Sequence, residues 1–209
     1  MELFLKQIMQ VKDMCLKNKI IFVTVIFFFS EFVHGQDNPN NKIINYLENL
    51  KFFSASFIQE ENGSLSNGKL FVGDDRIRVE YENPTKILIV FSSDKAMYYD
   101  YELDEIEFFD PKSTMAWFFY DIFNNPNFIK DSDKKISENY MFFEKNGSNE
   151  FGDYIVKIYF EDKPIVIRKI ALISENLSLN ISIFDHIYNE KFNKNFFKLI
   201  NPTFFDEGK

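Results

Sequence analysis

Short segments in which apolar and polar residues alternate recur along most of this 209-residue chain. In residues 76–81, for example, isoleucine, valine and tyrosine alternate with two arginines and a glutamate. A period of two residues is typical of a β-strand with one buried face. About ten such segments separated by tight turns predict an antiparallel sheet. We therefore expect a mainly β protein: a strongly curved antiparallel sheet, or unclosed β-barrel.

The alternating segments define where strands are expected. They cover residues 53–59, 68–72, 76–81, 86–91, 97–100, 105–109, 140–145, 153–161, 165–174, 177–183 and 196–200. An Asn-Gly pair is a common turn sequence between strands. We therefore expect Asn146-Gly147 to separate two of these strands.

Two other segments carry apolar residues at helical spacing. The first covers residues 39–50, where Pro39 suits a first helical turn. The second covers residues 115–123 and follows the sequence Pro-Lys-Ser-Thr. We expect both helices to cover the sheet. The second is either a plug that fills the core or a lid over an apolar cavity.

The first 35 residues have a different pattern from the rest. Lysines precede an apolar run at residues 20–29, and small or β-branched residues lie close to Gly35. This order is typical of a secretory signal peptide, and the run is shorter than the about 20 residues that span a bilayer. We predict cleavage near Gly35 and a single domain over residues 36–209, with Met1 or Met14 as the start. An uncleaved membrane anchor is the alternative.

Cysteine and charge exclude several classes of protein. The only cysteine, Cys15, precedes the apolar run, whereas a lipid-modified cysteine would follow it. The mature chain therefore has no thiol for a disulfide, a nucleophile or a metal site. The net charge is −8 and there is no block of Lys or Arg, so nucleic acid and anionic lipid surfaces are poor partners.

Side chains suited to catalysis are scarce. Beyond the expected cleavage point His186 is the only histidine, and neither a Gly-x-Ser-x-Gly turn nor a glycine-rich phosphate loop occurs. Carboxylates crowd residues 100–110, but their spacing matches no calcium loop. We expect a protein without enzymatic activity, cofactor or metal. A hydrolase that uses Asp104 and Glu105 is the alternative from the enzyme class.

Phenylalanine is the most unusual feature of the composition. The chain has 27 of them, more aromatic bulk than the core of a small domain needs. An AT-rich genome would raise the same count. A curved sheet of this size either fills its interior with side chains or holds one apolar ligand, and the composition leaves both outcomes open.

Several short motifs occur in a particular order along the chain. They are Phe53-x-Ala55-x-Phe57-x-Gln59, Gly68-x-Leu70, Ile77-Arg78-Val79-x-Tyr81-x-x-Pro84, Ile89-Val90 with Tyr98-Tyr99-Asp100, Pro111-x-x-Thr114, and Asn195-Phe196-Phe197 before Pro202. In this order and spacing the chain resembles the LolA-type outer-membrane lipoprotein carrier family.

The resemblance implies a periplasmic carrier that binds the acyl chains of lipoproteins. Such a carrier would take its cargo from an inner-membrane lipoprotein-releasing ABC complex and pass it, as a monomer, to an outer-membrane lipoprotein acceptor. The alternative is a periplasmic lipid- or lipoprotein-sensing module on the same scaffold, without transport activity.

The alternation also predicts which side chains would form the acyl-chain site, although a shift of one residue in register would invert each face. The cavity and lid residues expected are Phe53, Phe57, Phe71, Ile77, Val79, Tyr81, Ile89, Phe91, Met115, Trp117, Phe118, Phe119 and Ile122. Many family members carry an Arg-Pro pair between the second and third strands, and this Arg is implicated in cargo transfer. Here Gly73-Asp74-Asp75 stands in that stretch, so Arg76 or Arg78 is the candidate for that role.

Overall fold

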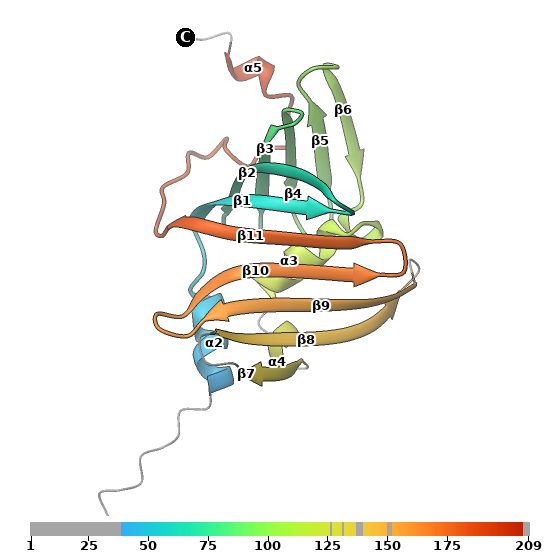
Figure 1. Cartoon of the computed structure of the whole chain (residues 1–209). Coiled ribbons are helices and arrows are strands. Elements are labelled where there is room, and N and C mark those ends of the chain that lie inside the picture. Colours follow the sequence, from blue (N-terminus) through green and yellow to red (C-terminus); the bar gives the residue numbers. More distant parts are fainter. Residues whose placement is uncertain (1–38, 126, 131, 137–139, 150–151, 207–209) are drawn as a thin grey trace, which may run out of the picture. The chain divides into compact units, whose positions relative to one another are not determined.

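The computed structural model describes residues 39–206 except 126, 131, 137–139 and 150–151. Its main feature is an eleven-stranded antiparallel sheet in the order β6-β5-β4-β3-β2-β1-β11-β10-β9-β8-β7 (Figure 1). The strands are β1 (Phe53–Glu61), β2 (Ser64–Val72), β3 (Ile77–Asn83), β4 (Ile87–Phe91), β5 (Ala96–Asp100), β6 (Glu105–Phe109), β7 (Asp133–Ile136), β8 (Tyr140–Asn149), β9 (Gly152–Glu161), β10 (Val166–Ser174) and β11 (Ser178–Ile187). The signal peptide expected at residues 1–35 lies outside the described residues.

The sheet consists of two meanders joined in its middle. Strands β1 to β6 form one meander and β7 to β11 the other, and the pairing of β1 with β11 connects them. The edges β6 and β7 are not paired with each other, so the sheet is unclosed. In Figure 1, β5 and β6 run across the direction of β8 to β11, as the twist of a large antiparallel sheet requires. The expected fold class is confirmed.

Among the described residues, three helical segments lie where the chain passes from one sheet edge to the other, one helix precedes β1, and a short one follows β11. They are α2 (Pro39–Glu48), the 3-10 helix η1 (Pro111–Ser113), α3 (Ala116–Asn124), α4 (Asn127–Lys130) and the short α5 (Thr203–Asp206). After β6 the chain must reach the opposite edge at β7, so η1, α3 and α4 cross one face of the sheet (Figure 1). The predicted covering helices at residues 39–50 and 115–123 are therefore present as α2 and α3.

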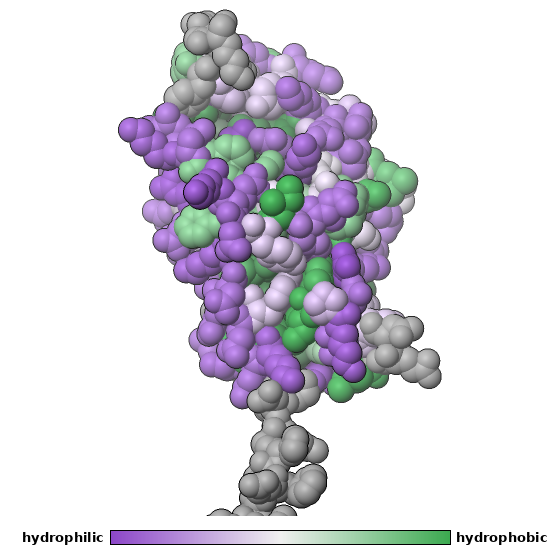
Figure 2. All heavy atoms as spheres, turned by 90° about the vertical axis from the view of Figure 1, so that its left-hand side faces the viewer, coloured by the Kyte–Doolittle hydropathy of each residue, from purple (hydrophilic) through white to green (hydrophobic). Residues whose placement is uncertain are grey.

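Apolar side chains are divided between the two faces of the sheet. The larger cluster lies under α2, α3 and α4, where α2 contributes the buried residues Ile43, Ile44 and Leu47. A smaller cluster around Leu88 and Met97 lies on the other face of β4 and β5. The side of the molecule seen in Figure 2 is largely hydrophilic, with scattered apolar side chains. In the described part of the chain, no helix is long and apolar enough to cross a membrane.

The turn predicted at Asn146-Gly147 is wrong, because β8 continues through it to Asn149. Gly147 pairs with Tyr154 on β9. A Cβ atom at Gly147 would overlap the ring of Tyr154. The glycine thus allows close approach of a cross-strand ring, a use that the Asn-Gly sequence does not reveal.

The strand predicted at residues 196–200 is also wrong, since this segment forms turns. The backbone N–H of Phe196 donates to the carbonyl of Asn193 at 3.1 Å, and that of Lys198 donates to Asn195 at 3.1 Å. The spacing of its aromatic side chains is similar to that of a strand, but these side chains pack against the face of the sheet that carries the smaller cluster. In contrast, β7 was not expected, because its sequence Asp-Lys-Lys-Ile is mostly charged. Lysines are common on edge strands, where they oppose edge-to-edge association.

Candidate functional site

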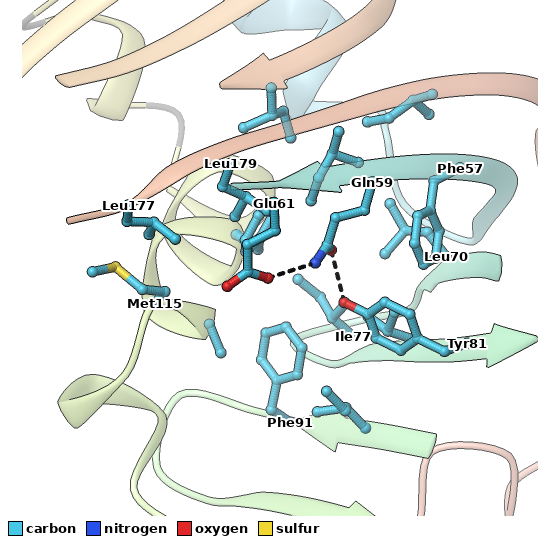
Figure 3. Close-up of a pocket in the computed structure, with 17 residues that line it drawn as sticks. Phe57, Gln59, Glu61, Leu70, Ile77, Tyr81, Phe91, Met115, Leu177 and Leu179 are labelled. Atoms are coloured by element: carbon cyan, nitrogen blue, oxygen red, sulfur yellow. Dashed lines mark hydrogen bonds between the residues drawn. The ribbon is translucent and has the colours of Figure 1, made fainter. Parts of the chain in front are cut away.

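An apolar pocket with a volume of about 240 Å³ lies between the sheet and α3 (Figure 3). Strands β1 to β4, β10 and β11 form its walls, and the beginning of α3 borders it. The lining residues are Phe57, Gln59, Glu61, Leu70, Ile77, Val79, Tyr81, Ile89, Phe91, Met115, Ala116, Phe119, Ile170, Leu177, Leu179, Ile181 and Ile183. A concave, mostly apolar pocket with a few polar groups is the usual form of a small-ligand site.

Strand register aligns the pocket wall. Val79 on β3 lies between its pairing partners Leu70 on β2 and Ile89 on β4, and these three side chains form a row across the sheet. Side chains opposite each other in a ladder share one face. The apolar residues that alternate with polar ones in residues 76–81 therefore form part of a continuous apolar wall of the pocket.

Most of the predicted cavity residues line this pocket. They are Phe57, Ile77, Val79, Tyr81, Ile89, Phe91, Met115 and Phe119. The first six come from strands, and Met115 and Phe119 come from the start and the first turn of α3. The structure thus brings together residues as far apart in the sequence as Phe57 and Phe119, while their binding to acyl chains stays a prediction.

Four other predicted residues hold the surrounding structure instead of lining the pocket. Phe53 packs against Phe123, with ring centroids 5.7 Å apart, and Ile122 is fully buried in the core. Phe118 contacts Tyr154 edge-on at 4.6 Å between centroids. Trp117 stacks on the ring of Tyr120, a residue of its own helix, at 5.1 Å. They secure α3 against the sheet and the second meander.

Phe71 lies on the opposite face of the sheet, which corrects its assignment to the cavity. Its neighbour Leu70 faces the pocket, so alternation directs Phe71 away from it. There the Phe71 ring meets Phe196 at 5.0 Å and Phe192 at 6.1 Å. Leu70-Phe71-Val72 is a continuous apolar run, so alternation does not show which of its side chains face inward, and the predicted face was one residue out of register.

Arg76 and Arg78 contact the C-terminal segment and not the pocket. Arg76 donates from Nη1 to the carbonyl of Phe197 at 2.8 Å. Arg78 donates from Nη1 to the carbonyl of Phe196 at 2.8 Å, and its guanidinium lies 4.5 Å from that ring. It also pairs with Glu80 at 2.5 Å. These contacts occupy both guanidinium groups in holding residues 190–200 on the outer face.

Tyr81 was expected in the cavity, but the two polar side chains that form a row with it, Gln59 and Glu61, were not predicted there. The Tyr81 hydroxyl donates to Oε1 of Gln59 at 2.9 Å, and Nε2 of Gln59 donates to Glu61 at 3.1 Å (Figure 3). Burial, together with the negative charge of Glu61, raises the pKa of Tyr81 to about 12, so the phenol keeps its proton at neutral pH. The period-two pattern of β1 places Phe57, Gln59 and Glu61 on one face and contained the signal for this row.

Helix α3 is fastened to the turn between β2 and β3. The hydroxyl of Tyr120 donates a hydrogen bond to Asp75, in the turn between β2 and β3. Burial and this bond raise the pKa of Tyr120 to about 12. The carboxylate of Asp75 therefore connects the sheet to the helix that borders the pocket.

The residues considered for catalysis are placed apart from the pocket. The His186 ring lies beside the rings of Phe53 and Tyr188, at centroid distances of 6.2 and 5.9 Å, and these two rings also contact each other at 6.4 Å. On the 100–110 hairpin, Asp100 accepts hydrogen bonds from the backbone N–H groups of Glu102 and Leu103 and so fixes the turn. Among the described residues, no group of three His, Cys, Asp or Glu side chains is arranged to hold a metal ion.

Together these features define an open antiparallel sheet with an apolar pocket under a crossing helix. No protein-family model matches the chain. An uncharacterized protein of Rickettsia prowazekii (strain Madrid E) is 27% identical over 203 residues, which cover 90% of each chain.

Solved structures with a similar chain path are more distant in sequence. An uncharacterized conserved protein from Thermus thermophilus has a TM-score of 0.49 and 9% identity, covering 78% of this chain and 95% of that one. A LolA superfamily protein from Nitrosomonas europaea has a TM-score of 0.44 and 7% identity, covering 76% and 97%. The complex structure of MucA/MucB from Pseudomonas aeruginosa has a TM-score of 0.45 and 11% identity, covering 77% of this chain and 60% of that one. At these identities, the similarities say nothing about which molecule the pocket binds.

Proposed function

We propose that this protein is a carrier that shields the acyl chains of lipoproteins in the pocket between the sheet and α3. The observation that carries the proposal is the pocket itself, whose walls are apolar except at the row formed by Gln59, Glu61 and Tyr81. Among the described residues that line it, none is a histidine, serine or cysteine. The apolar wall supports the binding of an apolar ligand.

Acyl chains need such protection in water. A chain of roughly 15 methylenes costs on the order of 12 kcal/mol to expose, at about 0.8 kcal/mol per methylene. A lipoprotein therefore crosses an aqueous compartment only with its chains covered. The apolar residues along β3, β4 and β11 offset this cost by replacing water around the chain.

The size of the pocket requires α3 to move for a large cargo. Its volume of about 240 Å³ lies below the range of about 300–1,000 Å³ that is usual for ligand pockets. Only part of an acyl chain fits the closed form. Under our proposal a cargo with several chains displaces α3, whose first turn carries Met115 and Phe119 into the wall.

The same proposal includes the compartment and the partners. The protein would act in the periplasm after cleavage near Gly35, as a monomer and without a cofactor. It would receive lipoproteins from an inner-membrane releasing ABC complex and deliver them to an outer-membrane acceptor. The order of the sequence motifs and the signal-peptide pattern support this part of the proposal.

Release of lipoproteins from spheroplasts tests the proposal. The purified protein is expected to bring newly made lipoproteins into the supernatant as a complex. Phe119→Asp places a charge in the pocket wall and should abolish this release. Phe108→Asp makes the same change on the exposed edge strand β6, where 51% of the side chain is accessible, and should leave release intact.

Two outcomes would count against transport. Absence of lipoprotein from the supernatant with the unaltered protein contradicts the carrier function. If the protein nevertheless binds acylated peptides in solution, the sensing alternative on the same scaffold replaces it. Equal release by both variants would place the acyl chain outside this pocket.

A further inference from the structure

The amide of Gln59 retains hydrogen-bonding capacity inside the pocket. Only 9% of the residue is exposed. Its Oε1 accepts from Tyr81 and its Nε2 donates one hydrogen to Glu61. A primary amide has two N–H donors and two acceptor lone pairs. One donor and one lone pair of Gln59 are therefore left for a ligand, and an unpaired buried polar group is costly.

The phenol of Tyr81 extends this capacity on the acceptor side. Its proton is committed to Gln59 at 2.9 Å, which leaves the lone pairs of the hydroxyl oxygen. The row thus offers an N–H donor beside two oxygen acceptors. An amide group of a ligand has the complementary set, a carbonyl oxygen and an N–H. An ester carbonyl satisfies the donor alone.

Glu61 adds a charge to the same row. Among the described residues that line the pocket it is the only charged one, and it lies at the exposed end of β1. A negative charge at this position repels an anionic head group that approaches with its chain in the pocket. An uncharged head group is not repelled by Glu61.

Resting on the proposed function, we propose that Gln59, Tyr81 and Glu61 select acyl chains that end in an uncharged carbonyl group over fatty-acid carboxylates. The hydrocarbon lies along the apolar wall, and the carbonyl oxygen accepts a hydrogen bond from Nε2 of Gln59. In an amide, the N–H donates to the oxygen of Tyr81 or Gln59. A fatty-acid carboxylate would bring a second negative charge next to Glu61.

Competition between two ligands of equal chain length tests the selection. The uncharged dye N-phenylnaphthylamine reports occupancy of the pocket, and palmitoylethanolamide and palmitate compete with it at neutral pH. The amide is expected to displace the dye at a concentration about tenfold lower than palmitate. Displacement by both at the same concentration would overturn the inference and leave the proposed function standing.

Three variants assign the selection to its residues. Gln59→Leu keeps the size and should weaken amide binding about tenfold relative to binding of the dye. Glu61→Gln should strengthen palmitate binding relative to amide binding. Glu60→Gln removes the same charge on the other face of β1, where the Glu60 carboxylate accepts hydrogen bonds from Gly63 and Asn180. This control should not change the affinity for either ligand.

The possible failures are distinguishable. If Gln59→Leu weakens the dye and both ligands equally, Gln59 has a structural role and the inference is wrong. The same conclusion follows if Glu61→Gln and Glu60→Gln have equal effects on palmitate. If the unaltered protein binds neither the dye nor either ligand, the inference falls together with the proposed function.

Discussion

At the scale of single residues, Gly68 marks the closest approach between β2 and β3. It pairs with Tyr81, next to a shift in register at Asn67. A Cβ atom at Gly68 would overlap the backbone carbonyl of Glu80, which cannot rotate away as a side chain can. Glycine therefore lets β3, which carries Tyr81, lie close to β2, the strand that separates it from Gln59 on β1.

The substitution Gly68→Ala is therefore expected to separate β2 from β3. We expect the free energy of unfolding to fall by about 1–3 kcal/mol, as for other overpacked sites. Urea denaturation measures this loss. Ser66→Ala, two positions earlier on the same strand, is the matched control and should change stability little. An unaltered midpoint for Gly68→Ala would show that the backbone at this position adapts freely.

His186 makes stability depend on pH. Burial, with a further contribution from Arg168, lowers its pKa below the ordinary value of 6.5. The unfolded chain therefore binds a proton on this histidine at a higher pH than the folded protein does. The stability linked to neutral His186 is present above pH 6.5 and is lost as the pH falls through the lower folded pKa.

The unfolding free energy is accordingly expected to decrease from about pH 7 to pH 5. His186→Phe keeps an aromatic ring beside Phe53 and Tyr188 but cannot bind a proton. Its stability should be nearly constant over the same interval, as measured by chemical denaturation at each pH. The same slope in both proteins would assign the effect to other groups.

At the scale of elements, α3 has weak ends and depends on its contacts. The residue before it, Met115, makes no side-chain capping hydrogen bond, and its first turn has no acidic residue. A capping side chain normally contributes about 1 kcal/mol to a helix. Buried side chains such as Phe118 and Ile122, together with the Tyr120–Asp75 bond, therefore hold α3 in place.

Tyr120→Phe removes that bond and keeps the ring. We expect amide hydrogen exchange in α3 to accelerate about fivefold to tenfold, and the dye to enter the pocket faster. Tyr98→Phe, which removes a hydroxyl bonded to Asp100 on β5, should leave exchange in α3 unchanged. Slower entry of the dye in Tyr120→Phe would contradict the role of α3 as a lid.

The elements also show where local patterns were informative. Strands with clear alternation, such as β3, and the amphipathic helix α2 were predicted close to their observed bounds. Edge strand β7 and the short α4 were not, because neither has enough apolar residues for a period to be recognised. The 196–200 segment has a strand-like spacing of apolar residues. It forms no strand, because each inner strand of the sheet already pairs with two neighbours.

At the scale of the whole molecule, the two meanders share one core. The larger cluster includes Ile77 and Phe91 from the first meander and Ile158 and Phe160 from the second. Both pack under the helices that cross from β6 to β7. A shared core of this kind favours a single cooperative transition.

We therefore expect far-ultraviolet circular dichroism and the fluorescence of Trp117, the only tryptophan, to give the same midpoint in urea. The first signal reports the sheet and the second reports α3. If the fluorescence changes at a lower urea concentration, α3 detaches before the sheet unfolds. That result would contradict a single transition, although it would agree with a lid that opens easily.

The sequence by itself determined the class of fold, the positions of most strands and the apolar row that includes Val79 and Ile89. These features follow from periodicity, which is local and depends on burial of one face of each strand. Periodicity does not tell which of two faces is covered by α3 and which by a distant segment. Only the tertiary structure decided that Phe71 meets Phe196, and that Gln59 and Tyr81 share the pocket. Such contacts depend on how the sheet curves and which strands become neighbours.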